Sequence, residues 1–175
     1  EPQVITPEGV VNKDAAILPE PIGGKYMIIH RVAESICADF LSSLDFSKEK
    51  VDECIEIMSP RRGMWDGGKV GLAAPPVKTK EGWLLLYHGV SWSTTYRVGA
   101  VLLDLEDPTI VKARTAIPLF EPHAEYEHKG VVPNVVFPCG LVVRGNTAYM
   151  YYGAADSVTG VATVKVSAIL KMLEV

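Results

Sequence analysis

The chain has 175 residues, of which 48% are hydrophobic, and its formal net charge is −4 at pH 7. This length supports one domain with a substantial core, and no apolar run approaches the roughly 18 residues of a membrane span. The acidic balance argues against a polyanionic partner, so we expect a globular protein that binds neither nucleic acid nor a membrane.

The sequence opens at Glu1 rather than at a methionine. Such a start indicates a processed end, an expression boundary or a cut through a longer protein. Its three cysteines, Cys37, Cys54 and Cys139, are an odd and scattered set. Their spacing matches neither a disulfide framework nor a zinc site and is typical of a reducing compartment. We therefore expect a cytoplasmic protein without a metal centre.

Apolar runs of strand length recur along the chain, each after a turn that contains proline. In chain order, the most apolar are residues 25–32 (KYMIIHRV), 82–90 (GWLLLYHGV) and 147–154 (TAYMYYGA). A helical period is visible only near the C-terminus. Together with 15 glycines and 12 prolines, these runs predict an all-β fold.

The three runs also align with one another as a repeat. Tyr26, Trp83 and Ala148 correspond, which gives spacings of 57 and 65 residues. A period somewhat above the roughly 40–50 residues of familiar propeller repeats predicts blades of about four strands with longer loops, and three blades fit this chain. Further strands are expected within residues 35–43, 53–60, 96–105 and 109–119.

Polar residues collect at equivalent ends of these repeats. Lys13 and Lys69 each stand six residues before a turn proline, so the repeat places both on strands that enter the blades. In a propeller, such strand ends converge on the central channel. His88 ends the buried run 82–90; taken alone, it is better explained by a structural hydrogen bond than by catalysis.

Five stretches, in this order, resemble glycoside hydrolase family 130, the β-mannoside phosphorylases and related mannosidases. They are KDAAILPEPIGGKYMIIHR, WDGGKVGLAAPPVKTKEGWLLLYHGVS, YRVGAVLLDLEDP, YEHKGVVPNVVFPCG and YMYYGAADSVTGVA. The family is a five-bladed β-propeller. The resemblance therefore implies that residues 1–175 are one segment of about three blades, from the C-terminal part of a catalytic domain.

The resemblance also implies a phosphate site, because Lys69 and His88 match positions that hold inorganic phosphate in the phosphorylases. A lysine supplies a compact charge with several donors, and an imidazole can donate to a phosphate oxygen. An inverting hydrolase normally needs two carboxylates, whereas phosphate is already nucleophilic. Phosphate would be a co-substrate, and no metal or organic cofactor is implied.

The catalytic acid of the family is a single aspartate that protonates the leaving oxygen through a hydroxyl of the bound mannose. That aspartate lies on an earlier blade, so we expect it upstream of this chain. Asp14 belongs to a different motif; we interpret it as supporting the site and keep it only as a fallback acid. An arginine of the phosphate site is also expected at or before the start, and residues 1–12 do not supply it.

Three residues are assigned to sugar binding. Asp156 matches a position that hydrogen-bonds the mannosyl unit, and a carboxylate can accept two neighbouring sugar hydroxyls. The alternative for Asp156 is an Asx turn before Ser157. Tyr96 is placed in the same pocket. Asp66, with Trp65, forms either part of a sugar platform or a cap on the loop into Lys69.

The sequence thus predicts phosphorolysis of a mannose-containing oligosaccharide or glycoside to mannose 1-phosphate. One alternative is a β-mannosidase of the same family that uses water, although the pair Lys69 and His88 favours phosphate. Another is a sugar-binding fragment without activity, since the acid is not found here. Three blades of a five-bladed ring would expose apolar faces, so we expect the missing blades or a homo-oligomer to cover them.

Overall fold

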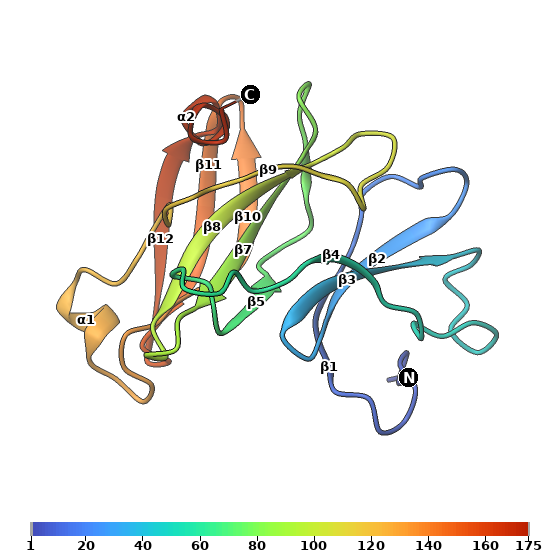
Figure 1. Ribbon diagram of the computed structural model, residues 1–175, viewed down its shortest axis with the longest axis horizontal. Coiled ribbons are helices and arrows are strands. Elements are labelled where there is room, and N and C mark those ends of the chain that lie inside the picture. The colour runs from blue at the N-terminus through green and yellow to red at the C-terminus, as the bar shows by residue number, and fades with distance from the viewer. Residues whose placement is uncertain (1, 175) are drawn as a thin grey trace.

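The computed structural model describes residues 2–174, whose strands form three antiparallel sheets lying side by side (Figure 1). The first sheet is a meander in which each strand pairs with the next along the chain. It contains β1 (Asn12–Ile17), β2 (Tyr26–Val32), β3 (Ser35–Leu41) and β4 (Ile55–Met58). Alternating burial in β1 and continuous burial in β2 follow the apolar pattern of these segments.

The second and third sheets repeat this arrangement. The second has the order β5 (Lys69–Leu72), β7 (Trp83–Val90), β8 (Tyr96–Leu103) and β9 (Val111–Arg114), and the short β6 (Val77–Lys78) also pairs with β7. The third has the order β10 (Val136–Arg144), β11 (Thr147–Ala154) and β12 (Val158–Lys165). Two helices, α1 (Glu125–His128) and α2 (Val166–Met172), complete the described elements. The all-β prediction is confirmed, with one sheet for each predicted repeat.

The second sheet lies between the other two and buries both of its faces. Along β7, Leu85 and Tyr87 belong to the core shared with the first sheet, whereas Leu84 and Leu86 belong to the core shared with the third. Because successive side chains of a strand point to opposite faces, one uninterrupted apolar run serves both cores. The predicted helical segment near the C-terminus is α2, and its Ile169 fills the second of these cores.

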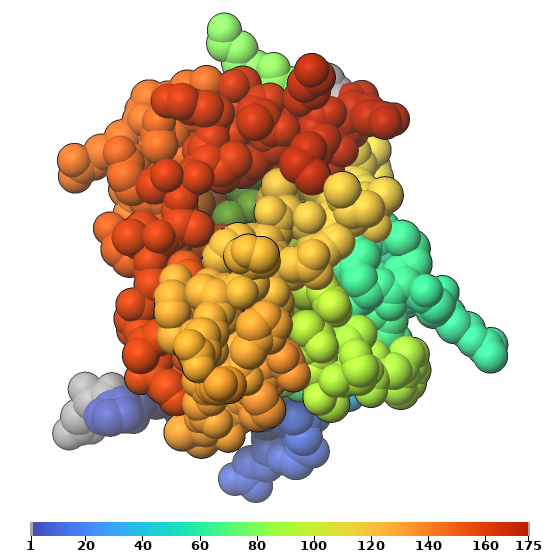
Figure 2. All heavy atoms as spheres, turned by 90° about the vertical axis from the view of Figure 1, so that its left-hand side faces the viewer, coloured from blue at the N-terminus to red at the C-terminus, as the bar shows by residue number. Residues whose placement is uncertain are grey.

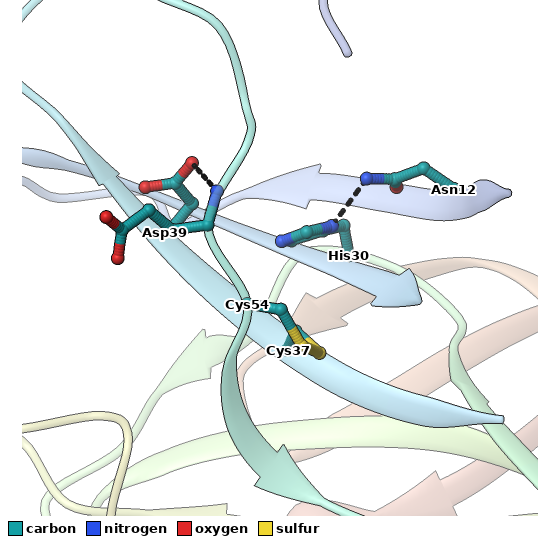
Figure 3. The surroundings of a disulfide bond; sticks show 6 residues. Asn12, His30, Cys37, Asp39 and Cys54 are labelled. Atoms are coloured by element: carbon teal, nitrogen blue, oxygen red, sulfur yellow. Dashed lines mark hydrogen bonds between the residues drawn. A yellow bond between two sulfur atoms is a disulfide. The ribbon is translucent and has the colours of Figure 1, made fainter. Parts of the chain in front are cut away.

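The structure corrects the prediction for the cysteines. Cys37 on β3 and Cys54 just before β4 form a disulfide, with their Cα atoms 5.0 Å apart (Figure 3). Spacing along the chain missed this pair because the antiparallel pairing of β3 with β4 brings the two residues together. Cys139 is free and exposed. The prediction of a reducing, cytoplasmic compartment rested on unpaired cysteines and loses that support.

Within residues 2–174, no helix has the length and apolar character needed to cross a lipid bilayer.

Candidate active site

Three of the predicted site residues meet at one end of the second sheet. Lys69 pairs with Val90, Val90 pairs with Tyr96, and His88 lies two residues before Val90 on the same face of β7. The ammonium of Lys69 lies 5.1 Å from the centroid of the Tyr96 ring. The register of β5, β7 and β8 thus gathers a cation, an imidazole and a phenol from three separate segments.

His88 is buried where the second and third sheets meet. Its exposed fraction is 1%, and its ring centroid lies 4.6 Å from that of Phe137 on β10. Burial lowers the pKa of His88 to about 4; Asp14 opposes this shift, while Arg31 and Lys69 reinforce it. The imidazole is therefore neutral at pH 7 and carries one N–H. In the described part of the chain, its Nδ1 has no hydrogen-bond partner.

Asp14 reaches this histidine from the first sheet. Its Oδ2 accepts a 2.7 Å hydrogen bond from Arg31 Nε and lies 3.8 Å from His88 Nε2. The residue has φ of 52° at an irregularity in the pairing of β1 with β2 between Lys13 and Ala16. A non-glycine residue in this region is strained, and such strain clusters at functional sites. The geometry fits the interpretation of Asp14 as a supporting residue.

Gly71 on β5 provides the space in which these two side chains approach each other. A Cβ at this position would lie 2.4 Å from His88 Cε1 and 2.5 Å from Asp14 Oδ2. Real Cβ atoms essentially never come so close, so only glycine fits here without displacing a neighbour. The site is therefore built across the first and second sheets as well as the third.

A cavity of about 300 Å³ joins Tyr96 and Phe137 to Asp156. Asp156 stands in the turn between β11 and β12, where Ser157 N donates a 3.0 Å hydrogen bond to Ala154 O. Both central residues, Ala155 and Asp156, have positive φ, the pattern of a type I′ turn. The exposed carboxylate of Asp156 makes no hydrogen bond within residues 2–174, so the Asx turn is not formed.

Asp66 lies apart from this cluster, in a position that fits the alternative of a loop cap and not that of a sugar ligand. Its exposed fraction is 0%, and its carboxylate accepts hydrogen bonds from Arg61, Tyr87 and Arg114 at 2.6–3.2 Å. Burial raises the pKa of Asp66, but these partners outweigh burial and hold the pKa below its ordinary value. The carboxylate thus holds the loop that precedes Lys69 in place, and neither of its oxygens is exposed to a ligand.

Sequence reasoning missed three residues of this site: Arg31, Gly71 and Phe137. Gly71 left a signal, because a glycine inside an apolar strand indicates a close approach of another group. Arg31 and Phe137 left none, since an arginine after an apolar run and a phenylalanine within one are both common. No group of three or more metal-ligating side chains gathers within residues 2–174.

Comparison with known proteins identifies the family and several relatives of this chain. The family model for glycoside hydrolase family 130, described as beta-1,4-mannooligosaccharide phosphorylase, matches residues 3–175. A 1,2-beta-oligomannan phosphorylase of Thermoanaerobacter sp. (strain X514) is 47% identical over 151 residues, which cover 86% of this chain and 50% of that protein. A beta-1,2-mannobiose phosphorylase of Listeria innocua is 44% identical over 168 residues, covering 94% and 47%.

The solved structure of the beta-1,2-mannobiose phosphorylase from Listeria innocua, in complex with beta-1,2-mannobiose, superposes with a TM-score of 0.87 at 43% identity. The alignment covers 93% of this chain and 47% of that one. The chain thus spans about half the length of the curated relatives it matches. Its three sheets are blades of the five-bladed propeller of these relatives. The chain belongs to glycoside hydrolase family 130.

Proposed function

We propose that the protein containing this chain cleaves β-mannosides with inorganic phosphate and releases mannose 1-phosphate. The observation that carries the proposal is the cluster of Lys69, His88 and Tyr96 beside the cavity that Asp156 lines. Lys69 provides a positive charge for an anion, and the neighbouring carboxylate of Asp156 can accept hydrogen bonds from sugar hydroxyls. The relatives named above, which are phosphorylases of mannosides, support the same reaction.

In this proposal each residue has a defined task. The charge of Lys69 attracts phosphate, and the neutral imidazole of His88 donates its one N–H to a phosphate oxygen. The carboxylate of Asp156 accepts hydrogen bonds from mannose hydroxyls, while Tyr96 and Phe137 pack against apolar parts of the sugar. A phosphate oxygen then forms the new bond to the anomeric carbon as the bond to the leaving oxygen breaks.

The proton for the leaving oxygen comes from an aspartate upstream of residue 1, on a blade that this chain does not include. Asp14 is unsuited to that task because its Oδ2 is held by Arg31 and because it lies beside His88 rather than in the Asp156 cavity. We place residues 1–175 in the C-terminal part of the catalytic propeller, with the remaining blades supplied by the same natural chain or by a partner subunit.

Replacing Lys69 or His88 by alanine in the full-length natural protein tests the phosphate site. Loss of a charged hydrogen bond costs roughly 1.5–3 kcal/mol, so kcat/KM for phosphate should fall roughly 10- to 100-fold. Lys48→Ala is the matched control, because that side chain is 78% exposed and forms a surface ion pair with Asp45. Mannose 1-phosphate and free mannose are measured with and without phosphate.

The alternatives give different results in the same assay. Release of free mannose at an unchanged rate without phosphate would identify a hydrolase. Sugar binding with no turnover under either condition would identify a binding fragment. Wild-type phosphate dependence in both variants would remove Lys69 and His88 from the anion site.

A further inference from the structure

Within residues 2–174, the third sheet lacks the fourth strand that the other two sheets have. β4 is the fourth strand of the first sheet and pairs with β3, and β9 is the fourth strand of the second sheet and pairs with β8. In the third sheet β12 takes the place of β3 and β8, but in the described part of the chain it pairs only with β11. The outer edge of β12 is therefore unpaired there.

The repeat indicates where a fourth strand would pair with β12. In the repeat, Ala148 of β11 corresponds to Trp83 of β7. Trp83 pairs with Leu103 on β8, and Ala148 pairs with Val164 on β12. The stretch of β12 that ends at Val164 thus corresponds to the stretch of β8 that ends at Leu103, and β8 pairs with β9 through its last three residues. A fourth strand is expected beside residues 162–164.

An apolar hollow of about 190 Å³ lies beside the same three residues, between the second and third sheets. Figure 2 shows it below α2 (dark red), with green atoms of the second sheet at its base. Its lining includes Ala162, Thr163 and Val164 of β12, Leu86 of β7, Met150 of β11 and Ile169 of α2. In the second sheet, the position opposite Leu103 is taken by Val111 of β9, which packs against the core. The hollow lies where a fourth strand would bury such a side chain.

The composition of β12 is typical of a strand with neighbours on both sides. Unpaired edges of natural sheets commonly carry charged residues or proline, which discourage pairing with another chain. The two fourth strands follow this rule, with Glu56 on β4 and with Lys112 and Arg114 on β9. β12 has neither a charged residue nor a proline from Val158 to Val164. Its sequence favours a neighbour on the outer side.

A second copy of β12 would fill the hollow poorly. Paired side chains lie on the same face of a sheet, and the partners of the buried Met150 and Tyr152 are only Ala162 and Gly160. About half of each curated relative, by contrast, lies outside the region that this chain matches, which leaves ample sequence for one more strand.

We propose that an extended segment of the natural protein outside residues 1–175 pairs with β12 beside residues 162–164, as the fourth strand of the third sheet. Because successive side chains of a strand alternate between faces, this segment places an apolar side chain in the hollow and the next one on the opposite face. Such a strand rests on the larger propeller assumed in the proposed function, but it is independent of the reaction with phosphate.

Hydrogen exchange in the full-length natural protein, followed at single amides by NMR, tests this pairing without a variant. At a free edge every second N–H points away from the sheet, so slow and fast amides alternate. We expect the amides of residues 162–164 all to be protected, roughly 100-fold or more. Fast exchange of every second amide in this stretch would overturn the proposal.

Nuclear Overhauser contacts of the Val164 methyl groups identify the neighbouring segment. Isotope-filtered spectra of mixed labelled and unlabelled protein separate contacts within one chain from contacts with a second copy. We expect contacts with residues of the same chain that lie outside residues 1–175. Contacts with a second copy, or none beyond residues 1–175, would also overturn the proposal.

Val164→Lys gives an independent test, because a covering strand would enclose the new charge and lower the melting temperature of the full-length protein by several degrees. Val158→Lys is the matched control: it lies on the same face of β12 outside residues 162–164, with an exposed fraction of 47% against 38% for Val164. Equal shifts in the two variants contradict a covering strand. Protected amides in a protein that does not consume phosphate would remove the proposed function and leave the fourth strand in place.

Discussion

At the scale of single residues, the proposed anion site combines the charge of Lys69 with a buried, neutral imidazole and a glycine. His88 is uncharged at neutral pH, and Gly71 contributes only the space that His88 and Asp14 occupy. The sequence indicated Lys69, His88, Tyr96 and Asp156 through their motifs. The sequence did not show that Asp66 has a different, structural environment. Its ion-pair partner Arg114 is 48 residues away along the chain, and only the fold brings the two together.

Gly71→Ala should raise the KM for phosphate at least 10-fold, because the new methyl group displaces the His88 ring or the Asp14 carboxylate. The measurement is phosphate-dependent turnover in the full-length protein. Gly140→Ala is the control, since a Cβ there meets its nearest neighbour, the Tyr151 side chain, at an ordinary 3.9 Å. Equal kinetics of the two variants would show that the Gly71 space is not needed.

The buried state of His88 should make the protein lose stability as the pH falls. Its pKa is about 4 when folded and near 6.5 when unfolded, so the unfolded chain binds the extra proton within that window. The free energy of unfolding therefore decreases from pH 6.5 to pH 4, by at most about 1.4 kcal/mol per pH unit from this group. Carboxylates with lowered pKa, such as Asp66, lose their contribution only below about pH 4.

Urea denaturation at several pH values, compared between the wild type and His88→Gln, measures this effect. The variant should show a shallower decline between pH 6.5 and pH 4, although part of the slope will remain because burial also lowers the pKa of His30. Asp14, Arg31 and Lys69 are the charged groups that influence His88. Identical slopes in both proteins would contradict a buried, neutral His88.

At the scale of elements, most strands were predictable because apolar alternation and turn residues mark them clearly. No separate strand was predicted at β12 (Val158–Lys165), and two shorter elements were also missed: β6, which has two residues, and α1, which has a single turn. Neither is long enough to display a period, so local sequence carries no signal for it. The disulfide was missed for a different reason. Cys37 and Cys54 come together because β3 and β4 pair in antiparallel fashion, and the spacing of the cysteines along the chain does not reveal this.

The Cys37–Cys54 disulfide ties the segment before β4 to β3 (Figure 3). In the same segment, the backbone N–H groups of Asp52 and Glu53 donate to the Asp39 carboxylate. Closing a loop of this size, with a sequence separation of 17, stabilises a protein by about 3 kcal/mol. Cys54→Ser should lower the free energy of unfolding by roughly that amount.

Urea denaturation with and without a dithiol reductant tests this prediction. The reductant should destabilise the wild type and leave Cys54→Ser unchanged. Cys139→Ser, which replaces the exposed free cysteine, is the control and should behave like the wild type. A wild type that is insensitive to the reductant, with Cys54→Ser equally stable, would show that the bond contributes nothing.

At the scale of the whole molecule, the three blades leave apolar surface uncovered. On the outer face of the third sheet, Val142, Tyr151 and Val161 are all exposed. The repeat along the chain predicted three blades, but the number of blades in the ring came from the family resemblance. Nothing in the local sequence specifies what covers this outer face.

Residues 1–175 produced alone should therefore associate or aggregate and lack phosphorylase activity, because contiguous apolar patches of more than a few hundred Å² are rarely tolerated in monomers. Light scattering after size-exclusion chromatography gives the mass, and mannoside cleavage with phosphate gives the activity. The full-length protein is the positive control. A folded monomer with full activity would contradict the prediction and make Asp14 the first candidate for the acid.

The continuous burial of β7 should limit how often this strand opens. A strand enclosed by two cores opens only when the blades separate, so its amides should be among the slowest to exchange with solvent. His88 is thus anchored to a fully buried strand, whereas Asp156 stands in a turn that is held by hydrogen bonds from Val131 N and Val132 N. In the proposed function, the protected strand carries a phosphate ligand and the exposed turn carries a sugar ligand. Substitutions in the turn can therefore change which sugar is accepted while the anion chemistry is kept.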